Sequence, residues 1–196
     1  FAGQALDGYR GAVFVNEATG EVVVSNGGTQ LSDVHDIISD LAMGPGSPPP
    51  QLVDAANLTS WAQQYATEND LGEVTATGHS LGGALAQLLA AEFGIRAETF
   101  NAYGAYDIAV KLGLNPSAAM DLVTNHRDAF DPVSSLSDHI GSSSMYMSEG
   151  EYNDLSAYGV EGALKRAWDT LGAHSISNFW DNDNLGKLFE HNYLSD

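Results

Sequence analysis

The first apolar runs along the chain are typical of β-strands. Residues 11–16 and 21–26 are rich in β-branched and apolar side chains, and a short loop over residues 17–20 lies between them. Two such runs joined by a short, glycine-containing loop predict a β-hairpin. We therefore expect an antiparallel pair of strands near the amino terminus.

Apolar residues at helical spacing dominate two later segments. The pattern predicts a helix over residues 53–68 and a second helix over residues 81–93, which Gly94 ends at a position that favours glycine. Four residues mark one face of the first helix: Leu58, Trp61, Ala62 and Tyr65.

Short apolar runs between and after these helices predict the remaining strands. We expect them at residues 73–77, 97–102, 121–126 and 144–147, followed by a helix near 158–171 and a mixed, largely helical segment at 175–193. Strands that alternate with helices indicate an α/β fold, with a mostly parallel sheet flanked by helices behind the antiparallel hairpin. The length of 196 residues suits one domain over residues 1–196.

Composition narrows the possible partners and the compartment. The 7 basic and 26 acidic residues give a formal net charge of −19, which opposes binding to nucleic acids and to anionic membranes. No run approaches the roughly 18 apolar residues of a membrane-spanning helix. The chain has no cysteine and begins at Phe1. We expect a soluble, secreted bacterial protein, either processed or excised from a longer chain.

The segment over residues 73–90 carries the chemistry. It contains the pattern G-x-S-x-G, with Gly78, His79, Ser80 and Gly82, between a predicted strand and a predicted helix. The two glycines permit a sharp turn, which exposes the serine hydroxyl at a helix amino terminus. That terminus also favours the oxyanion of a tetrahedral intermediate, with the N–H of Leu81 as one donor.

A serine hydroxyl becomes a good nucleophile only when a base accepts its proton. In this arrangement an acid and then a histidine follow the serine along the chain. Asp128 and Asp131 are the candidate acids. The candidate bases are His126, His139, His174 and His191.

The sequence resembles the class 3, fungal-type lipases of the α/β-hydrolase superfamily at four places. T-G-H-S-L-G-G-A over residues 77–84 resembles that family's serine turn, and D-P-V at 131–133 resembles its D-x-V. H-S-I-S-N-F at 174–179 resembles its late histidine followed by an aromatic residue. V-V-V-S-N-G-G-T at 22–29 resembles its strand ending in F-R-G-T, although Gly27 replaces the arginine.

The resemblance implies a serine carboxylic-ester hydrolase without a cofactor. It assigns Ser80 as nucleophile, Asp131 as acid, His174 as base and the N–H of Thr29 as a second oxyanion donor. Triacylglycerols, phospholipids at the first acyl position and short esters all fit, and the net charge favours neutral or zwitterionic interfaces. The alternatives are a phospholipase A1-type activity and a non-catalytic binding module.

A run of alternating oxygen-bearing side chains at residues 181–184 offers a weak calcium-binding pattern. A calcium loop counted from Asp181 needs Glu at its twelfth position, where Asn192 stands. We interpret the run as a solvated turn and expect no metal site.

The segment after Thr29 resembles the family's lid in its position. Its amphipathic face comprises Leu31, Val34, Ile38 and Leu41. A plain surface helix is the alternative interpretation.

If this face gates an acyl groove, replacing Val34 and Ile38 by serine removes apolar area worth about 1.5 to 3 kcal/mol per fully buried side chain. We expect turnover of long-chain esters to fall relative to short-chain esters, with little change in melting temperature. An unchanged ratio with a melting temperature several degrees lower would contradict a lid.

Overall fold

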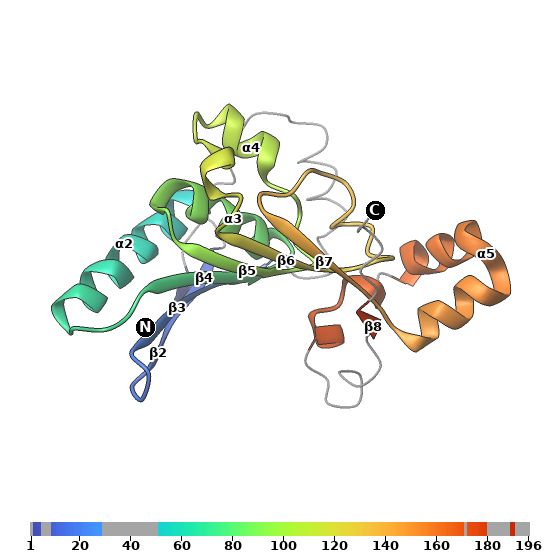
Figure 1. Cartoon of the computed structure of the whole chain (residues 1–196), viewed down its shortest axis with the longest axis horizontal. Helices are drawn as coiled ribbons and strands as arrows, with labels where there is room; N and C mark the ends of the chain where they lie inside the picture. Colours follow the sequence, from blue (N-terminus) through green and yellow to red (C-terminus); the bar gives the residue numbers. More distant parts are fainter. Residues whose placement is uncertain (1, 5–8, 29–50, 171, 180–188, 191–196) are drawn as a thin grey trace.

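A mixed sheet organises the part of the chain that the computed structural model describes, which is residues 2–4, 9–28, 51–170, 172–179 and 189–190 (Figure 1). In these residues the sheet has eight strands, whose order across the sheet follows their order along the chain. They are β1 Ala2–Gln4, β2 Arg10–Asn16, β3 Glu21–Asn26, β4 Val74–His79, β5 Arg96–Phe100, β6 Val123–Asp128, β7 Ser142–Met147 and β8 Phe189–Glu190.

The parallel part of the sheet runs from β3 to β7. The predicted hairpin is confirmed, and it is formed by β2 and β3. β2 and β3 pair antiparallel, with Val13 opposite Val24. From β3 to β7 each strand pairs parallel with the next one. At the two edges, β1 pairs antiparallel with β2, and β8 pairs antiparallel with β7. The fold is therefore the predicted α/β arrangement.

The helices follow from this strand order. Parallel neighbours joined by right-handed crossovers in one direction place the connecting helices on the same face of the sheet. α2, α3 and α4 lie together on that face, and α5 lies beyond the β7 end (Figure 1). The helices are α2 Leu52–Glu68, α3 Leu81–Phe93, α4 Tyr106–Lys111 and α5 Glu149–Thr170, with 3-10 turns η2 Pro116–Ala119, η3 Gly172–His174 and η4 Ile176–Phe179.

α3 is the central helix of the core. Its residues are buried without interruption from Leu81 to Ala90, and it packs on β3, β4 and β5. A helix that is apolar on all sides has to be enclosed by other elements. Gly94 ends it in the left-handed conformation, with φ of 66°, as the sequence predicted.

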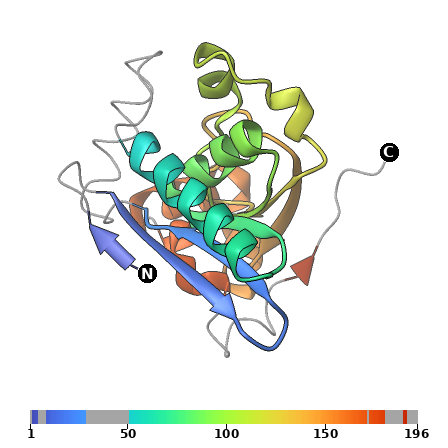
Figure 2. The ribbon, with the colours of Figure 1, turned by 90° about the vertical axis from the view of Figure 1, so that its left-hand side faces the viewer.

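The predicted face of α2 is confirmed at Ala62, which is buried, and at Leu58, which is partly buried against the core, but it is wrong at Trp61 and Tyr65. The residues of α2 that are buried are Leu52, Ala55, Thr59, Ala62 and Ala66. Trp61 and Tyr65 remain 42% and 36% exposed, and their rings stack on each other at 5.3 Å. α2 lies across β2 and β3 in Figure 2 and contacts β2, β3 and β4, and most of its buried side chains are small.

The carboxyl-terminal prediction is only partly correct. α5 begins earlier than predicted, at Glu149, and Gly159 interrupts its helical backbone with φ of 70°. The segment predicted as mixed helix contains η4 and the short strand β8, and its other residues from 180 onward lie outside the described part. Among the helices that the structure describes, none has the length and apolar composition of a membrane span.

The close contact of α2 with the sheet can be tested at Ala62. Replacing this fully buried alanine by leucine overfills the core, and we expect a loss of about 1 to 3 kcal/mol. Thermal unfolding should then occur several degrees lower. The Trp61→Ala variant is the control, and its melting temperature should change less. The opposite order of the two effects would show that the aromatic residues form the packed face.

Candidate active site

The turn between β4 and α3 holds Ser80 at a positive φ, with φ of 58° and ψ of −125°. A non-glycine residue rarely adopts positive φ, so the turn is enforced by its surroundings. The peptide N–H of Ser80 donates to the Phe100 carbonyl at 3.2 Å, and the Ser80 carbonyl accepts from the N–H of Gly83 at 3.1 Å. The hydroxyl is thereby placed at the carboxyl edge of the parallel strands.

Two glycines allow this turn because neighbouring backbones approach them closely. A Cβ atom on Gly78 would lie 2.7 Å from the backbone nitrogen of Gly83. A Cβ atom on Gly82 would lie 2.8 Å from the carbonyl carbon of Asn26 at the end of β3. Both distances are shorter than real Cβ contacts, so the G-x-S-x-G spacing is needed for this contact between helix and sheet.

The structure brings Ser80, His174 and Asp131 together from three separate segments. Nε2 of His174 lies 2.9 Å from the Ser80 hydroxyl, and Nδ1 lies 3.0 Å from Oδ1 of Asp131. Ser80 is 5% exposed, and the other two side chains are fully buried. A hydroxyl, an imidazole and a carboxylate in this order allow the imidazole to accept the hydroxyl proton.

The Asp131 carboxylate is anchored by the loop that follows β6. Its Oδ1 accepts from the N–H of Val133, and its Oδ2 accepts from the N–H of Ser134, each at 3.0 Å. The Ser135 hydroxyl donates to the Asp131 carbonyl at 2.9 Å. This loop fixes the carboxylate in one orientation toward the imidazole.

The alternative acid, Asp128, has a different environment. Its Oδ1 accepts from the N–H of Phe130 at 2.9 Å, and the side chain is almost fully buried. Burial, and then the neighbouring Glu151 carboxylate, raise the pKa of Asp128 to about 9. This carboxyl group is therefore mainly neutral at pH 7.

Three other histidines have different partners. His79 donates from Nε2 to the His174 carbonyl, and burial lowers its pKa to about 4, so it is neutral at pH 7. His139 contacts the Ser134 carbonyl through Nε2 at 2.8 Å, and burial lowers its pKa. His126 contacts the Tyr146 hydroxyl through Nδ1 at 2.8 Å.

Backbone from two segments borders the serine turn. α3 begins at Leu81, so the helix offers no acceptor for its N–H group. On the other side, a Cβ atom on Gly28 would lie 2.6 Å from the His79 carbonyl oxygen, which places this backbone against the serine turn. Arg10 of β2 donates to the Gly28 carbonyl at 3.0 Å, so a guanidinium is present here although Gly27 is not arginine.

Several predicted site residues lie outside the described part of the chain. They are Thr29, the lid residues Leu31, Val34, Ile38 and Leu41, the weak calcium pattern at 181–184 and His191. Among the described residues, no group of three or more carboxylates and histidines is arranged to hold a metal ion.

Asn101 is a site residue that the sequence analysis missed. It is fully buried directly after β5, and its side chain bonds to the backbones of Asp128 and Ala173. A single asparagine at a strand end is equally typical of an exposed turn, so the pattern gave no signal.

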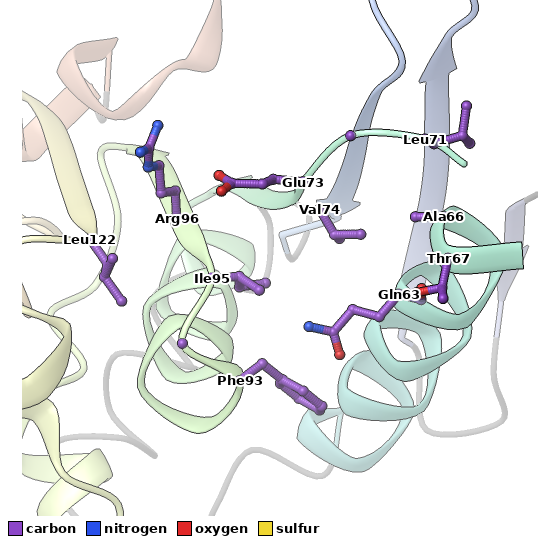
Figure 3. A pocket seen from close by; sticks show the side chains of 12 residues that line it. Gln63, Ala66, Thr67, Leu71, Glu73, Val74, Phe93, Ile95, Arg96 and Leu122 are labelled. Carbon is purple, nitrogen blue, oxygen red and sulfur yellow. The ribbon is translucent and has the colours of Figure 1, made fainter. Parts of the chain in front are cut away.

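A hollow at the opposite edge of the sheet does not belong to this site (Figure 3). It has a volume of about 560 Å³ and lies where β4 and β5 begin, whereas Ser80 follows the end of β4. Gln63, Glu73, Phe93 and Arg96 are among its lining residues.

Solved lipase structures share this fold. A deletion mutant of the Rhizomucor miehei lipase propeptide complex aligns with a TM-score of 0.55 and 17% identity, over 75% of this chain and 54% of that chain. A triacylglycerol lipase from Penicillium expansum aligns with a TM-score of 0.51 and 17% identity, over 76% and 69%. A lipase from Rhizopus microsporus var. chinensis aligns with a TM-score of 0.51 and 19% identity, over 74% and 59%. This chain therefore spans little more than half of the Rhizomucor enzyme.

Sequence comparison identifies the family. Curated protein sequences give no match. The phospholipase-like family described as the Tle-like phospholipase domain matches residues 3–176, which is most of the chain. With its class 3 lipase-like α/β-hydrolase fold, the chain belongs to the Tle-like phospholipase domain family.

Proposed function

We propose that this protein hydrolyses carboxylic esters of lipids through an acyl-enzyme formed on Ser80. The observation that carries the proposal is the continuous hydrogen-bonded row from the Ser80 hydroxyl through His174 to Asp131, with contacts of 2.9 and 3.0 Å. The family match and the lipase-like fold support the same chemistry.

In the proposed mechanism, His174 acts first as base and then as acid. A carboxylate only accepts hydrogen bonds, so Nδ1 of His174 donates to Asp131 and leaves the Nε2 lone pair for the Ser80 proton. Ser80 Oγ attacks the ester carbonyl, and the imidazolium returns the proton to the departing alcohol. Water then hydrolyses the acyl-enzyme by the same proton transfers.

The developing oxyanion requires donors on the side of the carbonyl away from His174. We assign the N–H of Leu81 as one donor and the N–H of Thr29 as the second. The position of the Gly28 backbone beside His79 supports the second assignment, because it brings the segment after β3 to the serine turn. Since these groups supply the nucleophile, the base and the oxyanion donors, we propose that the reaction needs no metal or cofactor.

We further propose that the substrate is a zwitterionic or neutral phospholipid, cleaved at an acyl ester. The family description supports a phospholipid, and the net charge of −19 disfavours anionic surfaces. Triacylglycerol is the alternative, since the Penicillium expansum relative is described as a triacylglycerol lipase. Comparing vesicles of phosphatidylcholine with emulsified triacylglycerol separates the two substrates.

Removing Ser80 or His174 tests the proposed nucleophile and base. Because members of a triad act as a unit, we expect Ser80→Ala and His174→Ala each to lower kcat on a p-nitrophenyl ester by about 1,000-fold or more. The His139→Ala variant serves as the comparison and should lose much less, since the hydrogen bonds of His139 in the described residues go to Ser134 and Gln87 rather than to Ser80. Near-normal turnover by the Ser80→Ala variant would refute the mechanism.

The two buried aspartates should respond differently to the same substitution. Asp131→Asn should lower kcat by roughly 1,000-fold or more, because the amide no longer stabilises the imidazolium. Asp128→Asn should retain activity, since Asp128 is mainly neutral at pH 7 with its pKa near 9.

The raised pKa of Asp128 also predicts a pH-dependent stability. The unfolded chain releases this proton above about pH 4, whereas the folded chain holds it to about pH 9, so folding loses stability as pH rises between these values. The melting temperature of Asp128→Asn should therefore fall less than that of the wild type between about pH 5 and about pH 9. Parallel curves would show that Asp128 is ionised in the folded protein.

A further inference from the structure

The short turn that carries His174 lies outside the sheet and is held by side-chain donors from other segments. His79, in the serine turn, donates to the His174 carbonyl. Asn101, directly after β5, donates from Nδ2 to the Ala173 carbonyl at 2.6 Å. The position of the His174 imidazole therefore depends on contacts made by its own backbone.

Asn101 differs from His79 because its amide also binds the segment that leads to the acid. Its Oδ1 accepts from the N–H of Asp128, the last residue of β6, at 2.7 Å. The carbonyl of Asp128 in turn accepts from the N–H of Asp131 at 3.1 Å. One side chain thus connects the backbone beside the base to the backbone that leads to the acid.

The amide has one orientation, because each backbone partner can play only one role. The Ala173 carbonyl can only accept and the Asp128 N–H can only donate, so Nδ2 faces η3 and Oδ1 faces β6. The peptide N–H of Asn101 adds a bond of 2.8 Å to the His126 carbonyl. The side-chain Nδ2 and Oδ1 and the peptide N–H of this fully buried residue therefore all have hydrogen-bond partners.

The backbone of Asn101 is strained. Its φ is 42°, in the left-handed region that disfavours residues with a Cβ atom. Asparagine tolerates this region better than most residues, because its short side chain bonds to nearby backbone groups. A buried, strained residue persists where its contacts determine the geometry around it, and such residues cluster at functional sites.

We propose that Asn101 is a positioning residue for ester hydrolysis, which holds the turn of His174 at a fixed distance from the loop of Asp131. The proposal rests on the proposed function, since it makes Asn101 responsible for the alignment of the proposed base with the proposed acid. Among the described residues Asn101 makes no hydrogen bond to Ser80, so it acts through the two backbones that it joins.

The Asn101→Asp variant separates the two contacts of the side chain. The carboxylate keeps an acceptor for the Asp128 N–H but places an oxygen against the Ala173 carbonyl, where a donor is required. We expect kcat on a short p-nitrophenyl ester to fall by roughly 10- to 100-fold with little change in KM. The rate of labelling by a fluorophosphonate probe should fall by a similar factor.

Asn125 offers a matched control on the neighbouring strand. It is also a fully buried asparagine, whose Nδ2 donates to the Ile140 and Ser142 carbonyls and whose Oδ1 accepts from the Thr99 hydroxyl. Asn125→Asp introduces the same charge at similar burial without touching η3. We compare the two variants at a temperature where circular dichroism shows that both are folded. Asn125→Asp should then react with the fluorophosphonate probe at a near wild-type rate.

A spectroscopic reading complements the kinetics. The Nδ1 proton of His174, shared with Asp131, should give a downfield proton resonance in the wild type and in Asn125→Asp. We expect this resonance to shift or broaden in Asn101→Asp. If Asn101→Asp lowers only the melting temperature, with labelling rate and resonance unchanged, Asn101 is structural and the inference is wrong.

Two further variants keep the test decisive. If Asn101→Asp does not fold, Asn101→Gly replaces it, because glycine accepts the positive φ and removes both side-chain bonds. It should show the same loss of labelling rate.

Ser80→Ala distinguishes the two proposals: if it retains hydrolysis, the proposed function fails. If it loses hydrolysis while the folded Asn101 variant labels at the wild-type rate, only the positioning role fails.

Discussion

The close contact between the first turn of α3 and the backbone of β3 is the constraint on which the site depends. α3 is buried along most of its length, so its position is set by the core rather than by the site. Gly82 then meets the Asn26 carbonyl with no room for a Cβ atom. This packing holds Ser80 at its positive φ, and its hydroxyl lies beside the imidazole of His174 at the carboxyl ends of the parallel strands.

The remaining parts of the site are arranged around that fixed serine by backbone hydrogen bonds. β6 leads to the Asp131 loop, whose own N–H groups orient the carboxylate. η3 receives donors from the serine turn and from Asn101. Asp128 and Asp131 are both buried within one short segment, yet only Asp131 contacts the imidazole, while burial beside Glu151 raises the pKa of Asp128. The different surroundings of these two nearby carboxyl groups therefore separate their roles.

Local patterns in the sequence predicted the helices and strands that are buried and therefore consist mainly of apolar residues. The hairpin, α3 and the strand before Ser80 carry apolar runs with glycine at the turns, and the residues proposed as a triad stand in the expected order. The predicted face of α2 was wrong at Trp61 and Tyr65, which stay at the surface, because the helix packs on the sheet mostly through small residues such as Ala55. Asn101 gave no signal, since its buried contacts join segments far apart in the chain.

Rapid-quench mass spectrometry can trap the proposed ester bond on Ser80. The enzyme is mixed with a p-nitrophenyl ester, quenched in acid within the first turnover and digested. We expect the acyl mass to accumulate on the peptide containing Ser80 and to disappear as turnover is completed. Turnover of the ester without any acyl adduct, or with the adduct on another residue, would rule out Ser80 as the nucleophile.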